Sequence, residues 1–324
     1  MSETALIAGF DAGQTHTSCR LSELSSGAVM AEGEGPGVCH LAAPDGPNRF
    51  HQALQGSLEQ AFSRLQKPAA LLAAGIGASG IEQGSPLQEA SRTLAAAALG
   101  LPLEHVVVTG DERTALRGAM GCNSGGIVVI SGTGTIAVGR NAAGEEHRCA
   151  GWGWLLDGAG SAMDLGRDGL ALTLEMADGR RPDAPWRARV WAGLGVACDD
   201  PQAAQTIKAL VVAPNFGPAG FAQLAPLVVT AASEGDPAAT DVVERSALAL
   251  ARMVAAISQR LQLDAPPVWP MGGALEHLKL LRNRLETNLE SLCPGARLLP
   301  PAGDARSGAL CLARDCLKPS AGAR

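Results

Sequence analysis

The stretch Ile127–Gly139, IVVISGTGTIAVG, decides the fold of this 324-residue chain. An apolar, mostly β-branched run ends in Ser131-Gly132-Thr133-Gly134-Thr135, and a second apolar run leads away from it. The pattern predicts a strand, a tight glycine turn and a returning strand. A tip of small residues leaves main-chain amides accessible, and converging amides suit an anion such as phosphate. An ordinary glycine-rich hairpin would have the same pattern, so other segments must decide between the two.

The composition predicts a globular protein with an aliphatic core. Hydrophobic residues make up 46% of the chain and charged residues 18%, whereas aromatic residues make up only 3%. The formal net charge of -6 argues against non-specific binding to nucleic acid or to an anionic membrane. No apolar run reaches the roughly 18 residues that span a bilayer, and the N-terminus lacks the basic region of a signal peptide. We therefore expect a cytoplasmic protein with no membrane or nucleic-acid partner.

The 8 cysteines are scattered singly along the chain. None of them forms a CxxC pair, so the sequence predicts neither a zinc ribbon nor a thioredoxin-type redox pair. We expect most of them to be small buried apolar residues in a reducing compartment.

A second strand–turn–strand unit begins the chain. The apolar run Leu6–Phe10 leads into Asp11–Thr17, DAGQTHT, and Ser18–Leu21 resumes the strand pattern. An Asp at a strand end can hold magnesium through water, and Thr hydroxyls and main-chain amides can bind phosphate. The alternative is an Asx turn that closes a surface hairpin, with His16 facing solvent.

Crossover connections follow these first strands. Helical spacing over Asn48–Leu65 and Pro86–Leu99 alternates with strand patterns at Ala69–Ala78 and His105–Thr109. The order βββαβαβα predicts a mixed sheet with helices packed on it. Asp111 stands at the carboxyl end of a strand, where ligands bind in open α/β sheets. Its alternative role is that of a helix N-cap.

The second half of the chain repeats this start. The opening hairpin is followed by Gly151-Trp152-Gly153-Trp154, a helix from Ala162 to about Met176, and a long helix at Ala238–Leu263. The strand Val268–Met271 then opens onto Gly272-Gly273, and Leu275–Leu289 follows as a helix. Because both halves begin with a strand, a glycine turn and a strand, we expect two homologous lobes facing each other across a cleft.

Five turns at strand ends occur in the order of the actin, sugar-kinase and heat-shock ATPase superfamily. Within it, the chain resembles the N-acetylglucosamine kinase and BadF/BadG/BcrA/BcrD ATPase family, nearest to the bacterial glucosamine and N-acetylglucosamine kinases. FDAGQTHT is similar to the first phosphate motif DGGGTKT, and VTGDERTALRGA resembles the catalytic-Asp segment. SGTGTIAVG resembles the second phosphate motif, and PMGGAL the adenosine motif. GWGWLLDGAGSAMDLGRDGL resembles the GGWG…DEGS…IGR block of amino-sugar kinases.

This resemblance covers nearly the whole chain and implies an α/β fold. Two actin-like, ribonuclease H-like lobes with mixed sheets flanked by helices would hold ATP in the cleft between them. The N-terminal lobe would comprise residues 1–118 and the C-terminal lobe residues 119–305. A C-terminal helix, about residues 306–324, would pack back on the first lobe. A homodimer is also common in such kinases.

The resemblance further implies transfer of the ATP γ-phosphoryl group to a sugar hydroxyl, O6 of N-acetylglucosamine or glucosamine. Asp111 would be the catalytic base and contact the sugar, and Asp11 would orient Mg²⁺. The residues implied in ATP binding are Gly13, Gln14, Thr15, Gly132, Thr133, Gly134, Thr135, Gly272 and Gly273. The further residues implied in sugar binding are Cys39, His40, Gly151, Trp152, Gly153 and Asp157.

Three departures from the family pattern leave the acceptor sugar open. Gln14 stands in place of a Gly, the sugar-binding Asn is missing from the loop Gly35–His40, and Asp157 lies one position before the acid of the DEGS block. Two other functions therefore stay open. One is an activator ATPase with a cysteine-held iron–sulfur cluster between two subunits, for which Cys122 and Cys149 are the candidate ligands. The other is an ATP- or sugar-binding regulator without turnover.

Overall fold

The computed structural model describes residues 3–318 and divides the chain into two compact units. Unit 1 comprises the chain up to Asn123 together with the part from Pro301 onward, and unit 2 comprises Ser124–Pro300. Across the described residues, the helices are all too short or too polar to cross a bilayer.

The sheet of unit 1 is mixed and has the strand order β3-β2-β1-β4-β5. The first three strands pair in antiparallel fashion, whereas β4 and β5 run parallel to β1. The parallel strands follow from the crossover helices that precede them in the chain. The strands of this sheet are β1 (Thr4–Ala12), β2 (His16–Glu23), β3 (Val29–Pro36), β4 (Ala69–Ala78) and β5 (Val106–Gly110).

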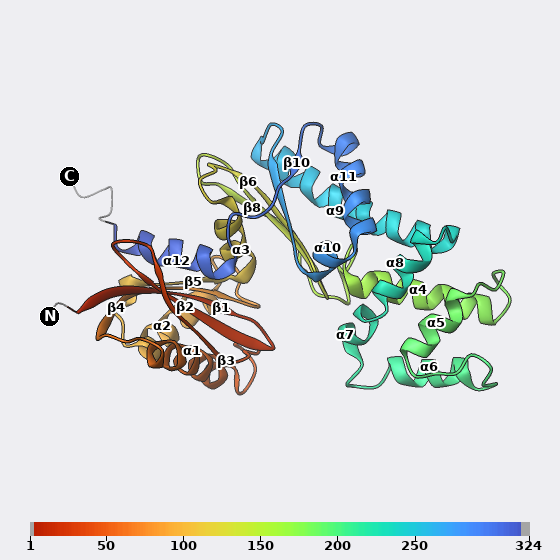
Figure 1. The fold of residues 1–324 in the computed structure, drawn as a ribbon, viewed down its shortest axis with the longest axis horizontal. Coiled ribbons are helices and arrows are strands. Elements are labelled where there is room, and N and C mark those ends of the chain that lie inside the picture. The colour runs from red at the N-terminus through yellow and green to blue at the C-terminus, as the bar shows by residue number, and fades with distance from the viewer. Residues whose placement is uncertain (1–2, 319–324) are drawn as a thin grey trace. The chain divides into compact units, whose positions relative to one another are not determined.

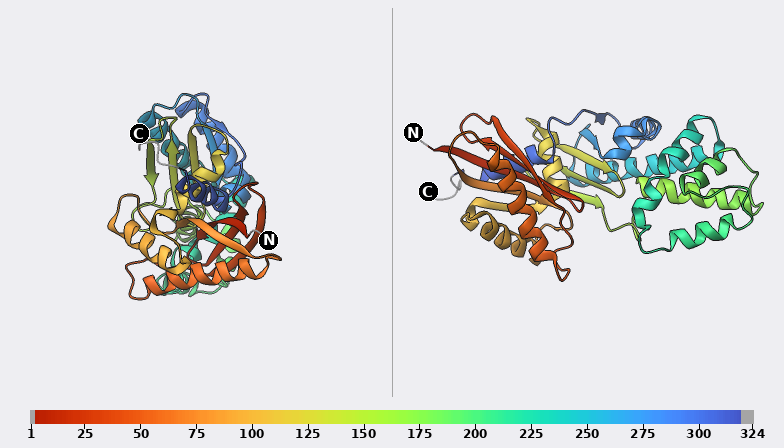
Figure 2. Two further views of the ribbon diagram at one scale, coloured as in Figure 1. Left: turned by 90° about the vertical axis from the view of Figure 1, so that its left-hand side faces the viewer. Right: turned by 60° about the horizontal axis from the view of Figure 1, so that its bottom comes forward.

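Helices cover both faces of this sheet (Figure 1). The helices α1 (Gly46–Ser63) and α2 (Pro86–Leu99) pack on one face, and α12 (Ala305–Cys316) lies on the other (Figure 2). The helix α12 approaches the strands closely because β1 carries Gly9 there. A Cβ atom at this position would lie 2.5 Å from the carbonyl oxygen of Arg306.

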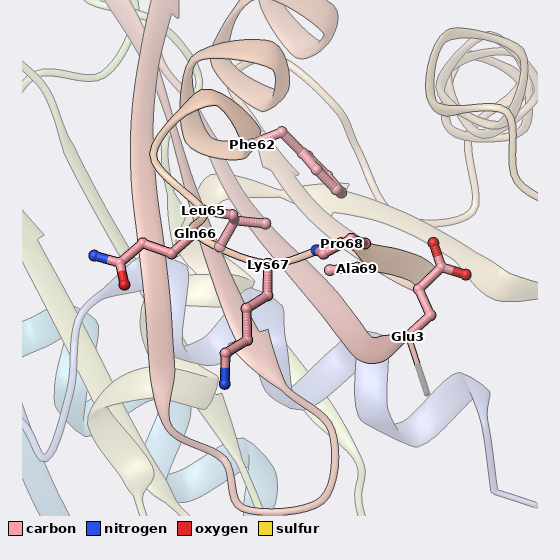
Figure 3. A pocket seen from close by; sticks show the side chains of 7 residues that line it. All are labelled: Glu3, Phe62, Leu65, Gln66, Lys67, Pro68 and Ala69. Atoms are coloured by element: carbon pink, nitrogen blue, oxygen red, sulfur yellow. The ribbon is translucent and has the colours of Figure 1, made fainter. Parts of the chain in front are cut away.

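A hollow of about 450 Å³ opens at the amino end of β4. Phe62, Lys67 and Pro68 are among the residues that line it (Figure 3). The strand ends that carry the predicted site lie at the opposite end of β4, so this hollow is not the predicted site.

The lobe boundaries predicted from the sequence differ by a few residues from those of the two units. The predicted boundary at 118/119 falls inside α3 (Asp111–Met120). Its last turn stays with unit 1 because the amide of Ala302 donates to the carbonyl of Ala119 over 3.1 Å. The predicted C-terminal helix is α12, but residues 319–324 of the prediction lie outside the described residues.

The sheet of unit 2 repeats the topology of unit 1. Its order is β10-β9-β6-β7-β8, so β6 to β10 take the places of β1 to β5. The strands β6, β7 and β8 are antiparallel, and β9 and β10 are parallel additions. The predicted repetition of the two halves is therefore confirmed. The strands are β6 (Gly126–Ser131), β7 (Thr135–Arg140), β8 (Glu146–Ala150), β9 (Pro267–Met271) and β10 (Arg297–Leu298).

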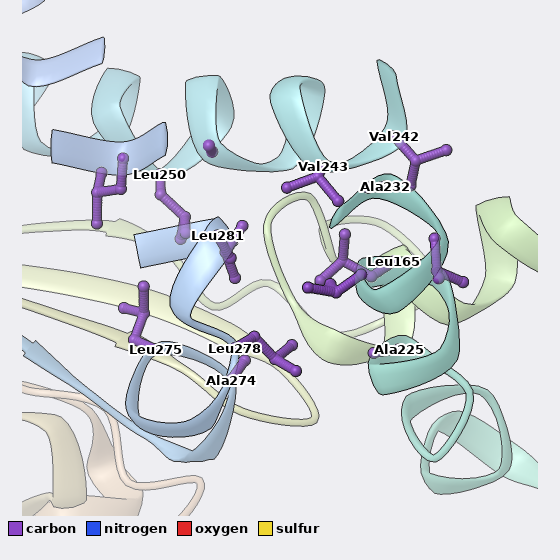
Figure 4. Packing of buried hydrophobic residues seen from close by; sticks show 14 of the residues in the cluster. Leu165, Ala225, Ala232, Val242, Val243, Leu250, Ala274, Leu275, Leu278 and Leu281 are labelled. Carbon is purple, nitrogen blue, oxygen red and sulfur yellow. The ribbon is translucent and has the colours of Figure 1, made fainter. Parts of the chain in front are cut away.

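The core of unit 2 is mainly aliphatic, with Trp186 and Trp191 buried in it, and it lies between the helices and the sheet of this unit (Figure 4). Leu165, Leu250 and Leu281 come from three different helices and are fully buried. Truncating one such leucine to alanine costs about 2–5 kcal/mol. The helices are α4 (Ala162–Ala177), α5 (Trp186–Gly193), α6 (Ala203–Val211), α7 (Gly217–Ala222), α8 (Ala225–Ser233), α9 (Pro237–Leu261), α10 (Gly273–His277) and α11 (Lys279–Leu292).

Two elements of unit 2 differ from the sequence prediction. Strand β8 was not predicted, because its sequence EHRCA is polar and only half-buried, and pairing with β7 alone defines it. The single helix predicted at Leu275–Leu289 is broken into α10 and α11. The break is at Leu278, whose ψ of 80° is not helical and whose side chain is buried in the core.

Candidate active site

Two carboxylates meet at one edge of the unit 1 sheet. Asp11 is near the end of β1, and Asp111 begins α3 directly after β5. The register pairs Asp11 with Gly77 on β4 and Ala78 with Gly110 on β5, so both acids stand at the carboxyl ends of neighbouring strands. Burial raises the pKa of Asp11, and the negative charge of Asp111 raises it further. The predicted acid pair is therefore close enough to interact.

A third acid, Glu112, lies beside this pair and was not singled out in the sequence. Its side chain is buried and forms an ion pair of 2.5 Å with Arg113. Burial, followed by the charge of Glu112 and a side-chain hydrogen bond with it, raises the pKa of Asp111 to about 6. A carboxylate with such a pKa is ionised at neutral pH and is a stronger base than a free Asp, as a general base requires. In the sequence, only the charged run Asp111-Glu112-Arg113 indicated this third acid.

The first glycine turn presents its main chain to solvent. The amide of Gly13 donates to the carbonyl of His16 over 3.1 Å, and Gln14 and Thr15 are exposed at the tip. Gly37 packs directly against the main chain of Gln14, where a Cβ atom would overlap it. His16 is exposed, as expected from the sequence.

The predicted sugar loop of unit 1 joins this turn. The amide of Val38 donates to the carbonyl of Gly13 over 2.9 Å. Cys39 is half-buried and His40 is exposed, and the Nδ1 atom of His40 accepts a hydrogen bond of 3.2 Å from the amide of Ala42. The sugar loop and the first phosphate turn therefore form one surface, at the strand ends that carry the acids.

The second glycine turn is bare at its tip. Added Cβ atoms at Gly132 and Gly134 would meet nothing within 4 Å, and Thr133 is exposed. The hydroxyls of Ser131 and Thr135 point the other way and donate to the carbonyls of Gly160 and Ala159 over 2.7 and 3.2 Å. A ligand at this turn would meet main chain and the side chain of Thr133, because the hydroxyl of Thr135 is engaged in holding the hairpin.

The tryptophan loop of unit 2 is exposed. Gly151 and Gly153 have φ values of 81° and 91°, and between them the Trp152 side chain is 62% exposed. The guanidinium carbon of Arg148 lies 4.4 Å from the centre of the Trp152 ring, a cation–π contact. The loop ends at Asp157, which is half-buried. After burial, the charge of this carboxylate is the second cause that raises the pKa of the Cys149 thiol.

The Gly-Gly turn of the predicted adenosine motif packs on the second hairpin. Gly272 has a φ of 89°, and a Cβ atom there would lie 2.5 Å from the carbonyl oxygen of Ser131. The amide of Gly272 already donates to Glu276 over 3.2 Å. The amide of Gly272 is therefore already engaged within the turn.

The acid pair fits a magnesium ion that is held mainly by its substrate. Within residues 3–318, no group of three or more His, Cys, Asp or Glu side chains could hold a metal. Mg²⁺ often takes one or two carboxylates and completes its shell with water and phosphate oxygens. Burial and then the charge of Asp111 raise the pKa of Asp11, and a bound cation would offset the charge of Asp111.

The duplicated units, with equal strand order and a glycine turn at corresponding ends, define an actin-like, ribonuclease H-like α/β fold. The chain belongs to the BadF/BadG/BcrA/BcrD ATPase family, whose model matches residues 8–308.

Comparisons with known proteins agree with this assignment. The N-acetylmuramic acid/N-acetylglucosamine kinase of Clostridium acetobutylicum is 24% identical over 95% of this chain and 98% of its own. A Chromobacterium violaceum protein, provisionally named an N-acetylglucosamine kinase, has a crystal structure with a TM-score of 0.72 and 29% identity, covering 97% of this chain and all of its own. A ROK family glucokinase from Streptomyces griseus, crystallised with glucose and AMPPNP, shares the fold with a TM-score of 0.55 at 16% identity, covering 96% and 98% of the two chains.

Proposed function

We propose that the chain is an ATP-dependent kinase that phosphorylates a hydroxyl of an amino sugar, O6 of N-acetylglucosamine or glucosamine. The observation that carries the proposal is the buried carboxylate of Asp111, at a strand end beside Asp11, with its pKa raised to about 6. Relatives named as N-acetylglucosamine kinases support an amino sugar as the acceptor.

The reaction needs one proton acceptor and a rigid frame for the phosphates. The sugar oxygen forms a bond to the γ-phosphorus while the bond from that phosphorus to the β–γ bridging oxygen breaks, which releases ADP. Asp111 accepts the proton of the sugar hydroxyl. Mg²⁺, when bound, supplies positive charge that offsets the phosphate oxygens, and Asp11 is the carboxylate that would orient it.

The remaining site residues bind and orient. The main chain at Gly13–Thr15 and at Gly132–Thr135 would hold phosphate oxygens, since both turns are accessible at their tips. Gly272 and Gly273 would lie against adenine. Cys39 and His40 in unit 1, and Gly151–Gly153 and Asp157 in unit 2, would contact the sugar, with Trp152 as an apolar face for it. The position of ATP between the lobes, a homodimer and a cytoplasmic location stay predictions.

The activator ATPase is less well supported by the thiols. Of the two candidate cluster ligands, Cys149 lies beside Asp157, and the raised pKa of its thiol opposes the thiolate form that iron requires. All eight cysteines are free.

The test is ADP release with Mg²⁺ and ATP across a panel of N-acetylglucosamine, glucosamine, N-acetylmannosamine and glucose. We expect release that depends on an amino sugar, and a 6-phosphate product by ³¹P NMR. Release that is equal without any sugar would favour an ATPase, and an iron–sulfur absorbance near 400 nm (a charge-transfer band) in anaerobically prepared protein would favour the activator. Sugar and ATP binding without any ADP release would favour the regulator.

A further inference from the structure

A loop that the proposed mechanism does not use lies next to the catalytic carboxylate. The chain leaves β4 at Ala78, which pairs with Gly110, the residue before Asp111. Five residues later, the exposed Gln83 turns back to this strand end. The hydroxyl of Thr109 donates to Oε1 of Gln83 over 3.2 Å. The Gln83 amide is therefore fixed beside Thr109, which lies two residues before Asp111 in the sequence.

The side chain of Gln88 fixes which end of the Gln83 amide faces inward. The amide of Gly84 donates to Oε1 of Gln88 over 2.8 Å, and Nε2 of Gln88 donates to the carbonyl of Val108 over 2.9 Å. These two main-chain groups allow only one orientation of the Gln88 amide. Its nitrogen then donates to Gln83 over 3.0 Å, and the receiving atom must be the oxygen.

The Gln83 nitrogen is consequently directed away from this network. Its oxygen already accepts from Thr109 and Gln88, which accounts for both of its lone pairs. Within the described part of the chain, the nitrogen of Gln83 donates no hydrogen bond to another residue, and the side chain is exposed. An ordered pair of N–H donors therefore stands at the sheet edge that carries the base.

We propose that Gln83 is a specificity-determining residue whose Nε2 donates to an oxygen of the acceptor sugar, beside the hydroxyl that Asp111 deprotonates. The proposal rests on the proposed kinase function. The ligand chemistry is an oxygen with a free lone pair, which a sugar hydroxyl and an acylamino carbonyl both supply. An ammonium group offers no lone pair, so two N–H donors discriminate against it.

Two substitutions separate this role from a structural one. Gln83→Glu keeps an oxygen for Thr109 and Gln88 but replaces the outward nitrogen by a second oxygen. Gln83→Leu removes the whole amide and adds no charge beside Asp111. We expect both variants to raise the KM for the sugar by about tenfold or more, with the KM for ATP and kcat at saturating sugar within about twofold of the wild type.

The matched control is Gln66→Leu. Gln66 is also exposed, but it precedes β4, at the strand end remote from Asp111 (Figure 3). This variant should keep the wild-type KM for every sugar. The Tm of Gln66→Leu and of Gln83→Glu should stay close to that of the wild type, whereas Gln83→Leu removes the acceptor of Thr109 and Gln88 and should lower the Tm slightly.

Measuring the variants with each sugar of the panel shows which sugar oxygen accepts the hydrogen bond from Gln83. An effect of Gln83→Leu that is confined to N-acetylglucosamine assigns the acyl carbonyl, and an equal effect on N-acetylglucosamine, glucosamine and glucose assigns a hydroxyl. A wild-type KM in Gln83→Glu, or a loss confined to kcat, overturns the proposal. If the wild type turns over no sugar, the kinase function fails separately. Calorimetric titration with the same sugars then decides, because sugar binding that Gln83→Glu does not weaken also overturns the role of Gln83.

Discussion

The two units share one strand order but differ in the chemistry at corresponding strand ends. Unit 1 has the acid Asp11 before its glycine turn, whereas unit 2 has Ser131, whose hydroxyl is held by the carbonyl of Gly160. In unit 1, burial is the main cause that raises the pKa of both carboxyls; the charge of Asp111 adds to the effect on Asp11, and the charge of Glu112 adds to the effect on Asp111. The hairpin of unit 2 offers only neutral groups, the main chain of its turn and the exposed side chain of Thr133. The duplication has thus separated an acid-bearing half, which suits a cation and a proton, from a neutral half, which suits phosphate oxygens.

The two units also differ in how the chain completes them. Unit 2 is one continuous segment, whereas unit 1 needs the returning segment that begins at Pro301. Arg20 on β2 joins this segment through an ion pair of 2.7 Å with Asp304, and it also pairs with Glu32 over 2.6 Å. Burial by itself would raise the pKa of Asp304, but hydrogen bonds from Ser307, Arg20 and Arg306 hold it well below its usual range.

Replacing the proposed catalytic base should have the largest effect on kcat, because it removes a proton acceptor that only unit 1 supplies. We expect Asp111→Asn to lower kcat by about 10³-fold while the KM for ATP changes little. The measurement is sugar-dependent ADP release. Glu104→Gln is the matched control, since Glu104 is exposed near the opposite end of β5 and should leave kcat unchanged. Near-normal turnover of Asp111→Asn would exclude Asp111 as the base.

The pH dependence of kcat/KM for the sugar tests the acid chemistry that distinguishes unit 1 from unit 2. The base must be ionised and its pKa is about 6, so kcat/KM for the sugar should fall about tenfold per pH unit below that value and be flat above it. Because the charge of Glu112 raises this pKa, Glu112→Gln should move the acid limb to lower pH. An acid limb that stays in place in Glu112→Gln would contradict the pairing of these two carboxyls.

Adding a methyl group to the second glycine turn tests whether unit 2, the neutral half, binds the phosphates of ATP. Gly134→Ala should raise the KM for ATP about tenfold, equivalent to ~1.4 kcal/mol of binding. The Tm should not change, because the new Cβ meets nothing within 4 Å in the protein. Gly179→Ala, at another exposed glycine of unit 2 with open space around it, controls for the added methyl group, although its φ of 81° adds some backbone strain. An unchanged KM for ATP would separate this hairpin from the phosphates.

Breaking the ion pair of the returning segment should destabilise unit 1 and leave unit 2 intact. Asp304→Ala removes charged hydrogen bonds, and we expect a loss of about 1–2 kcal/mol, since the side chain is 39% exposed and partly screened. The depressed pKa makes this contribution present at neutral pH and lost as the pH falls below the usual Asp range. Calorimetry should show one of two unfolding transitions lowered. The control is Asp315→Asn on α12, which breaks an ion pair with Arg117 of α3 and should cost less than about 1 kcal/mol.

The smallest expected effect concerns the tryptophan loop. Trp152→Ala should raise the KM for the sugar about threefold, the size of an exposed aromatic contact of ~0.5–1 kcal/mol. Leu155→Ala in the same loop is the control, because Leu155 is 78% exposed and is not expected to contact the sugar. Equal sugar KM values for the two variants would remove Trp152 from the acceptor site.

Much of the fold was predictable because its signals are local. The strand Ala69–Ala78 and the helix Pro86–Leu99 have the bounds predicted from apolar runs, proline and glycine. Strand β8 could not be predicted, since it is defined by its pairing with β7 and not by its composition.

The candidate site was predictable only where a residue type implies a chemistry. Asp11 and Asp111 stood out as acids at strand ends, and the register of β1, β4 and β5 brings them together. Gln83 and Glu112 did not stand out, because their positions depend on side-chain contacts with Thr109 and Arg113. The inward hydroxyl of Thr135 could not be foreseen for the same reason.

The discontinuity of unit 1 has a consequence for how the chain is made. During synthesis, every strand of unit 1 emerges early, but the face of β1 at Gly9 lacks its covering helix until α12 leaves the ribosome. Unit 2 is complete before that moment, because it ends at Pro300. We therefore expect the second half of the protein to reach its native state first, with the nascent first half held open until the final segment arrives.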